Sequence, residues 1–227
     1  ETGSGDETSA VARIFIAALG WTQSPLTVRP RAWSELAELP AVRRELLELF
    51  DVLEDRRGLT FPLDGRLASL PLRVHATYGL DEIMAAIDER TKTGAIRRLR
   101  EGVFHSRAHR ADLLFVTLDK SEADYSPTTM YRDYAVSPRQ FHWESQSGIH
   151  AETVTGQRYV EHERNGHAIL LFVRQRRETR PGVTGPYTFL GSCRYVSHHG
   201  ARPMGIEWAL DRDMPAWHSQ EVKVAGG

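Results

Sequence analysis

The sequence predicts an α+β protein, in which a helical N-terminal region is followed by a mostly antiparallel β-barrel or strongly curved sheet. Apolar residues recur at helical spacing up to about residue 95. From about residue 110 onwards, short apolar runs rich in strand-forming residues alternate with glycine and proline turns. We therefore expect a helical connecting region over residues 1–75, a β domain over 76–216 and a tail over 217–227.

The helical spacing predicts four helices, over residues 9–19, from Ser34, from Pro40 to Gly58 and from Asp81. Pro40 suits a first helical position, because proline lacks the N–H that would stay unpaired there. Gly58 suits a helix end, because glycine adopts the backbone conformation that terminates a helix. Asp81 and Glu82 bring negative charge to the positive end of the helix dipole, which marks the start of the last of these helices.

Seven apolar runs predict strands, over residues 112–118, 140–144, 158–162, 168–173, 187–190, 193–196 and 206–210. Between two of them, residues 174–186 contain Gly182 and Gly185 and predict a long hairpin loop. Strands joined by short turns pair antiparallel, because a parallel pair needs a long crossover connection. The second domain is therefore expected to be a compact barrel or curved sheet.

The composition restricts the classes of function. Among 227 residues there are 29 Lys and Arg and 30 Asp and Glu, so any nucleic-acid surface must come from local clustering of basic residues. The single cysteine, Cys193, excludes a disulfide framework and fits a reducing, cytoplasmic location. No apolar run approaches the roughly 20 residues of a membrane span. The chain does not begin with Met, and we expect a fragment of a longer protein.

Motifs for nucleotide hydrolysis, acyl transfer and zinc hydrolysis are absent from the sequence. It contains no Gly-x-x-x-x-Gly-Lys loop, no Gly-x-Ser-x-Gly elbow and no His-Glu-x-x-His helix. Two histidine pairs, His105 with His109 and His198 with His199, have no cysteine or carboxylate at a recognised ligand spacing. We therefore assign no catalytic residue, no metal and no cofactor to this chain.

Three further side chains with reactive groups are interpreted without a catalytic or metal-binding role. Cys193 begins an apolar strand, and free cysteine is among the most buried residue types, so it is expected in the core. Asp112 and Asp119 flank a predicted strand and are interpreted as surface charges, because magnesium sites built from carboxylates give only a weak signal in sequence.

Residues 118–159 combine aromatic, hydroxyl, amide and charged side chains, a mixture that indicates a pocket for a flat, polar ligand. Side chains alternate along a strand, so Phe141 and Trp143 should share one face, opposite His142. Core packing remains an alternative for this face. The candidate pocket residues are Tyr131, Asp133, Tyr134, Phe141, Trp143, Ser145, Gln146 and Ser147.

Basic residues accompany this segment. The candidates for contact with a phosphate backbone are Lys120, Arg132, Arg139, Arg158 and Arg174. Arginines continue through the predicted loop up to Arg180. A solvated loop explains the same run of charge, because blocks of charged residues are usually just hydrated.

Seven motifs, in this order, resemble a bacterial domain family of unknown function that closes the C-terminus of helicases fused to a phospholipase-D-like nuclease. They are Thr-Leu-Asp-Lys-Ser at 117–121, Ser-Pro-Thr-Thr at 126–129, Tyr-Arg-Asp-Tyr at 131–134, Phe-His-Trp-Glu-Ser-Gln-Ser at 141–147, Thr-Gly-Gln-Arg-Tyr at 155–159, Leu-Leu-Phe-Val-Arg at 170–174 and Pro-Tyr-Thr-Phe-Leu-Gly at 186–191. The resemblance covers residues 72–216. The helical residues before it resemble the region that connects the helicase to this domain.

The resemblance implies a β-barrel of the PUA-like group, which includes SRA, YTH, EVE and ASCH domains and reads a modified base in an aromatic pocket. The same layout occurs in modification-dependent (Type IV) restriction enzymes, whose C-terminal domain is expected to recognise 5-methylcytosine or 5-hydroxymethylcytosine. The nuclease and helicase motifs are missing from this chain, so it is expected to be a specificity domain without enzymatic activity. Its implied partners are modified double-stranded DNA and the helicase and nuclease domains of the full-length protein.

The implied mechanism is base flipping into a pocket lined by Tyr131, Tyr134, Phe141 and Trp143. Asp133 is the candidate acceptor for the cytosine amine, while the residues 145–147 would contact the base edge or a flanking phosphate. Two alternatives stay open. The pocket could be an active site for a nucleotide or modified base, with Asp133 or Glu144 as acid or base, or the barrel could be a protein-docking surface without DNA affinity.

Overall fold

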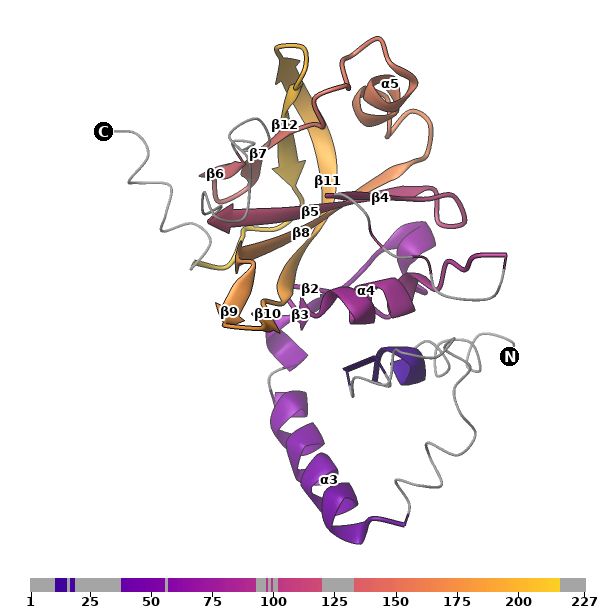
Figure 1. The fold of residues 1–227 in the computed structure, drawn as a ribbon, viewed down its shortest axis with the longest axis vertical. Coiled ribbons are helices and arrows are strands. Elements are labelled where there is room, and N and C mark those ends of the chain that lie inside the picture. Colours follow the sequence, from indigo (N-terminus) through magenta and orange to yellow (C-terminus); the bar gives the residue numbers. More distant parts are fainter. Residues whose placement is uncertain are drawn as a thin grey trace. The chain divides into compact units, whose positions relative to one another are not determined.

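In the computed structural model, two units divide the chain, residues 1–98 and residues 99–227 (Figure 1). The structure describes residues 11–15, 17–18, 38–55, 57–92, 97, 99, 102–119 and 133–216. The sequence placed the boundary after residue 75, which lies inside the first unit.

The first unit contains the predicted helices. Residues 11–15 and 17–18 are helical, within the predicted 9–19, and α3 covers Pro40–Asp55. The start of α3 at Pro40 confirms the prediction from the missing N–H of proline. The ring of Phe15 approaches that of Phe50 on α3, with centroids 6.2 Å apart. The short helix expected from Ser34 begins outside the described residues.

Short elements lead from α3 to the last helix of this unit. They are η1 Arg57–Leu59, β1 Phe61–Pro62, η2 Gly65–Leu67, β2 Arg73–Val74, β3 Thr77–Tyr78 and α4 Leu80–Ile87. Strands β1 and β2 pair antiparallel. Helix α4 confirms the helix predicted from Asp81, and the carboxylate of Glu82 accepts a hydrogen bond from the backbone N–H of Gly79. This bond satisfies a donor that the first helical turn leaves unpaired.

The second unit is built on one sheet. Its strands, in spatial order, are β4 Val103–Ser106, β5 Ala111–Asp119, β8 Ala168–Arg176, β11 Tyr187–His199, β12 Gly205–Leu210, β7 Gln140–Glu144 and β6 Tyr134–Ser137. All neighbours in this order pair antiparallel except β5 and β8, which run parallel. The α+β class and the mostly antiparallel sheet are therefore confirmed. Among the described strands β4 and β6 stand at the two ends of the order, so the predicted barrel is not closed.

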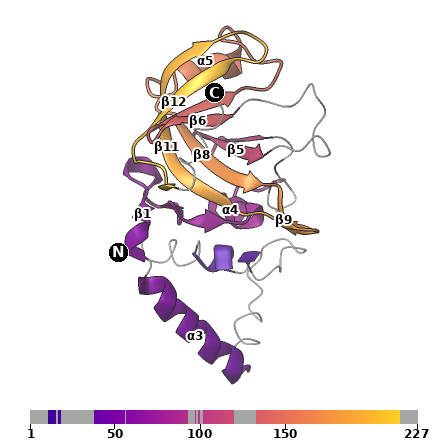
Figure 2. The same ribbon diagram turned by 90° about the vertical axis from the view of Figure 1, so that its left-hand side faces the viewer.

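The longest strand, β11, joins the two halves of the sheet. Residues Thr188 to Cys193 pair with β8, and Cys193 to His199 pair with β12. The register shifts between Phe189 and Gly191. Such irregularities bend a strand, which explains how one strand serves both halves and why it curves along its length (Figure 2). The sequence predicted two strands here, over 187–190 and 193–196, and the structure joins them.

The prediction of a strand over residues 158–162 is wrong, because helix α5 covers Val154–Val160. The hydroxyl of Thr153 accepts a hydrogen bond from the N–H of Gly156 at 3.0 Å and caps the helix. The predicted loop over 174–186 is a hairpin as expected, and it contains β9 Glu178–Arg180 paired with β10 Val183–Thr184. A cap outside the apolar run, and not the run itself, decides the conformation near residue 158.

The core of the second unit lies against one face of β7 and β12. Phe141 and Trp143 of β7 meet Trp208 of β12 and Tyr159 of α5, and all four side chains are at most 4% exposed. The ring of Trp143 stands edge-on to that of Tyr159, at 5.4 Å and 86°. The predicted alternation along residues 140–144 is therefore confirmed, with Phe141 and Trp143 on the core side.

No helix within the described ranges is long and apolar enough to cross a membrane.

We predict that Gly156→Ala destabilises the second unit. A Cβ at this position of α5 would lie 2.0 Å from the carbonyl oxygen of His150. Alanine in a helix usually gains about 1 kcal/mol over glycine, but this clash should outweigh it, with a net loss of about 1–3 kcal/mol in the free energy of unfolding. Gly148→Ala is the matched control, because a Cβ there meets nothing within 4 Å. Denaturant unfolding that gives equal stability for both variants would contradict the assigned packing.

Candidate functional site

Among the described residues, the predicted pocket rings are divided between the two faces of β7. Phe141 and Trp143 are 1% and 4% exposed and belong to the core, whereas Tyr134 is 47% exposed and packs against His142, on the opposite face of β7. Tyr131 lies outside the described residues, as do Lys120 and Arg132. Contact of Phe141 and Trp143 with a base stays a prediction.

The hydroxyl residues after β7 divide between interior and surface. Ser145 is fully buried. Its Oγ accepts a hydrogen bond from the N–H of Met204 at 2.9 Å, and its own N–H donates to the carbonyl of Met204 at 2.9 Å. Gln146 is half-buried and Ser147 exposed. Ser145 therefore fastens the end of β7 to the start of β12, and only the next two residues reach the surface.

Two of the three predicted phosphate-binding arginines that the structure describes are engaged inside the fold. Arg174 donates to the hydroxyl of Thr117 at 2.9 Å, and its guanidinium lies 4.5 Å from the ring centre of Tyr187. Arg158 forms an ion pair with Asp112. Arg139, by contrast, is exposed and forms an ion pair with Asp213. The contacts of Arg158 and Arg174 hold the fold together, and phosphate binding by any of the three arginines stays a prediction.

A row of stacked rings lies on the face of the sheet opposite the core. We call Tyr134, His142 and His199 the outer ring stack. The ring of Tyr134 lies 4.8 Å from that of His142 at an interplanar angle of 28°, and His142 lies 5.2 Å from His199 at 20°. His142 is 3% exposed, whereas its two neighbours are exposed. The rings come from three different strands, β6, β7 and β11.

Two residues of β12, Glu207 and Gly205, position the imidazoles of the outer ring stack. Nδ1–H of His142 donates to the Glu207 carboxylate at 2.8 Å, which fixes the orientation of the ring. A Cβ at Gly205 would lie 2.8 Å from Cε1 of His142 and 2.8 Å from Nε2 of His199. Glycine at 205 is therefore what allows the two imidazoles to approach each other over the strand.

Carboxylates stand beside the outer ring stack. Asp133 precedes Tyr134, and its Oδ1 accepts a hydrogen bond from the backbone N–H of Glu144 at 2.9 Å. This bond ties the residue before Tyr134 to the backbone at the end of β7. The arrangement offers an exposed aromatic face flanked by hydrogen-bond acceptors, which suits a flat ligand that carries an amino group.

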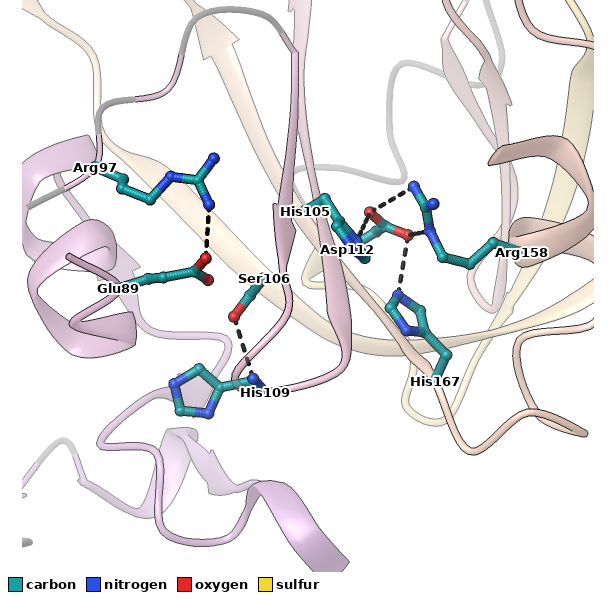
Figure 3. A network of polar contacts seen from close by, with 8 residues as sticks. All are labelled: Glu89, Arg97, His105, Ser106, His109, Asp112, Arg158 and His167. Atoms are coloured by element: carbon teal, nitrogen blue, oxygen red, sulfur yellow. Dashed lines mark hydrogen bonds and ion pairs between the residues drawn. The ribbon is translucent and has the colours of Figure 1, made fainter. Parts of the chain in front are cut away.

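A second polar cluster surrounds Asp112, which is fully buried (Figure 3). Nε of Arg158 donates to Oδ2 at 2.7 Å and its terminal nitrogen donates to Oδ1 at 3.3 Å. Nδ1 of His105 lies 2.9 Å from Oδ1, and Nε2 of His167 lies 3.0 Å from Oδ2. The interpretation of Asp112 as a surface charge is therefore wrong, because cross-strand and helix partners enclose it.

Asp112, His105 and His167 carry possible metal-ligand atoms within 4.8 Å of one another. A divalent ion there would meet the guanidinium of Arg158, which already bonds both carboxylate oxygens. The positive charge next to the carboxylate disfavours a second cation. The cluster is best described as a buried ion pair with two histidine donors. The sequence paired His105 with His109 by spacing, and only the register of β4 on β5 reveals Asp112 as its partner.

The ionisation of Asp112 stabilises the fold. Burial alone raises the pKa of this carboxyl, but hydrogen bonds from His167 and Arg158 outweigh burial, so the pKa lies below its usual value. A pKa lowered by folding means that the charge stabilises the fold above the unfolded-state value of about 3.9. This stabilisation is lost as the pH falls through the lower, folded-state pKa.

We predict that Asp112→Asn lowers the free energy of unfolding by about 3–5 kcal/mol near neutral pH, because Arg158 loses a buried partner. The gap between the two proteins should narrow as the pH falls below about 4. Asp119→Asn is the control on the same strand, because its pair with Arg176 is exposed and should contribute about 1 kcal/mol or less. Denaturant titrations between neutral and acidic pH measure both effects, and a gap that widens in acid would refute this account of Asp112.

The comparisons with known proteins agree with the motifs on the family and do not reach the function. No curated protein matches the chain significantly. One protein family, described as Domain of unknown function (DUF3427), matches residues 72–217. This range includes every described strand of the second unit and both polar arrangements described above. Because the match covers more than half of the chain, the protein belongs to the DUF3427 family.

Proposed function

We propose that this chain is a DNA-binding recognition domain that reads a modified cytosine, 5-methylcytosine or 5-hydroxymethylcytosine, in double-stranded DNA. It would serve a larger modification-dependent restriction enzyme, whose helicase and nuclease domains act on the DNA that it selects. The PUA-like architecture and the helicase context come from the resemblance of the motifs at residues 117–191. The observation that carries the proposal is the outer ring stack.

A base that leaves the duplex needs a new stacking partner. Flipping costs a few kcal/mol of lost stacking and pairing, and an aromatic side chain returns about 1–3 kcal/mol per stacked base. Tyr134 offers a ring that is nearly half exposed. His142 supports that ring from below, and Glu207 holds His142 in place. The rigid support reduces the ordering cost when a base stacks on Tyr134.

The acceptors beside Tyr134 fit the edge of cytosine. Cytosine presents an exocyclic amine, which carboxylates accept well. Asp133 stands next to Tyr134 and is held by its bond to the backbone of Glu144. Asp133 therefore keeps the role that the resemblance implies, while the stacking surface moves from the core rings of Phe141 and Trp143 to the outer ring of Tyr134.

We predict that Tyr134→Ala weakens binding of the modified duplex by between about fivefold and more than hundredfold, because one stacked base loses its partner. Val136→Ala is the matched control, since Val136 lies on the same strand, β6, and is 39% exposed. Tyr134→Phe keeps the ring and should retain most of the affinity. Fluorescence anisotropy at fixed salt with plain, methylated and hydroxymethylated duplexes gives the affinities.

The same titrations distinguish the proposed function from a protein-docking surface and from an active site. A wild-type protein without preference for either modified duplex would overturn the proposed function. Absence of affinity for any DNA would instead support a protein-docking surface. Turnover of a modified nucleotide or base by the isolated chain would support an active site at Asp133 or Glu144.

Base flipping itself has a separate readout. We predict that 2-aminopurine placed beside the modified cytosine brightens when the protein binds, because the neighbouring stack opens. The signal should fall in Tyr134→Ala at saturating protein and persist in Val136→Ala. An unchanged fluorescence with tight wild-type binding would show that the cytosine is read inside the duplex.

A further inference from the structure

The outer ring stack has two open ends, and the proposed function uses one of them. Tyr134 forms that end, and His199 forms the other. His142, between them, is 3% exposed, whereas His199 is exposed. Among the described residues, His142 is the only ring that approaches His199. One face of the His199 imidazole is therefore available to a second flat ligand.

His199 lies at the end of β11, away from the neighbouring strand β8. In the described sheet, β8 pairs with β11 over Thr188–Cys193, and residues 196–202 are all exposed. Figure 1 shows the loop that joins β11 to β12 at the opposite end of the sheet from β9 and β10. The pairing of His199 with Gly205 holds the imidazole over β12. The available face is therefore presented on a fixed strand end, which lowers the entropic cost of stacking.

The loop after His199 supplies a cation. Residues 200–204 connect β11 to β12, and Gly200 and Arg202 adopt positive φ angles of 70° and 74°. Arg202 is exposed, and no residue within the described ranges forms an ion pair or a hydrogen bond with its side chain. Three residues of chain span at most about 11 Å, so the Arg202 guanidinium can reach a phosphate beside the His199 ring.

The charges around His199 favour one orientation of a ligand. Glu207 lies two residues along β12 from Gly205, the pairing partner of His199. Its carboxylate, which accepts from Nδ1–H of His142, repels a phosphate. Arg202, in the loop, attracts one. A flat ring that stacks on His199 with its anionic group toward the loop satisfies both charges, and a nucleotide, with its base and its phosphate, has this arrangement.

Such a nucleotide must be distinct from the flipped cytosine. The two centroid distances, 4.8 and 5.2 Å, place the rings of Tyr134 and His199 at most about 10 Å apart. A base on each outer face adds about 3.4 Å, so the two bases lie about 17 Å apart, or about five base steps. Unpairing a second base costs about as much as one stacking contact returns. A base that is already single-stranded avoids this cost.

We propose that the His199 end of the outer ring stack binds a nucleotide of single-stranded DNA, with the base stacked on His199 and its phosphate on Arg202. The inference deepens the proposed function, because it rests on DNA binding but not on the reading of a modified cytosine. Stacking tolerates any sequence, since every base has a flat π face. The subsite therefore contributes affinity for a junction between duplex and single strand, without selectivity among bases.

A duplex with a single-stranded extension tests the inference. The extension, about ten nucleotides long, begins about five base pairs from the cytosine position, and both strand polarities are made. We predict that one polarity binds the wild type at least about fivefold more tightly than the blunt duplex does, by the same factor with plain and with modified cytosine. His199→Ala should lose this gain, and His199→Phe, which keeps a flat ring, should retain most of it. Fluorescence anisotropy at fixed salt measures these affinities.

Arg202→Ala should reduce the gain from the extension and its salt dependence. A phosphate contact on a single strand contributes about 0.7 to the slope of log affinity against log salt. The matched controls are His198→Ala and Arg164→Ala, which remove an imidazole and a guanidinium from exposed positions outside the stack. His198 is the neighbour of His199, but its ring bonds the hydroxyl of Tyr195. A gain from the extension that is equal in His199→Ala and in these controls overturns the inference.

A photocrosslink locates the single-stranded nucleotide directly. 5-Iodouracil in the extension reacts with aromatic side chains on irradiation, and mass spectrometry identifies the crosslinked residue. We predict a crosslink to His199 that His198→Ala retains and that Arg202→Ala weakens. A crosslink confined to other residues, or none despite a gain in affinity from the extension, contradicts stacking on His199.

The outcomes separate this inference from the proposed function. A gain from the extension that depends on His199, without preference for a modified cytosine, refutes the modified-base proposal and retains the subsite. A preference for the modified cytosine without a gain from either extension refutes the subsite alone. A wild-type protein without affinity for any DNA, blunt or extended, refutes both.

Discussion

The buried carboxylate of Asp112 is the constraint on which the second unit depends. A charge without water must be paired, since an unpaired buried carboxylate costs several kcal/mol. Its partners come from three places: His105 on β4, Arg158 on α5 and His167 before β8. The ion pair and the bond from His167 therefore fix α5 and the residues before β8 against β5. With α5 in place, Tyr159 closes the core behind Trp143.

The alternation along β7 divides the aromatic residues between the core and the outer ring stack. Phe141 and Trp143 fill the core, while His142 between them supports the exposed ring of Tyr134. A similar division applies to the arginines. Arg174 braces the hairpin of β9 and β10 from inside, and this hairpin presents other arginines to solvent. In the proposed function the contact of Tyr134 with a base provides selectivity, because phosphate contacts carry no sequence information.

Local patterns in the sequence predicted several elements because the causes of those elements are local. Pro40 starts α3 since a proline ring suits the first helical turn. The run at residues 140–144 is strand β7, and its alternation correctly paired Phe141 with Trp143. The motifs between residues 117 and 191 indicated the family that the comparison confirms. The apolar run at residues 158–162 predicted a strand where the structure has helix α5, because the Thr153 cap that starts the helix lies outside the run.

The sequence by itself determined the fold class, most strands and the family of this protein. Only the tertiary structure decided that Asp112 is an internal anion, that Arg158 and Arg174 are internal partners, and that Tyr134 is the exposed ring. The physical reason is the range of the interactions. Strand and helix periods depend on neighbouring residues, whereas the bond from Arg158 to Asp112 joins residues 46 apart and exists only when register and helix position are both set.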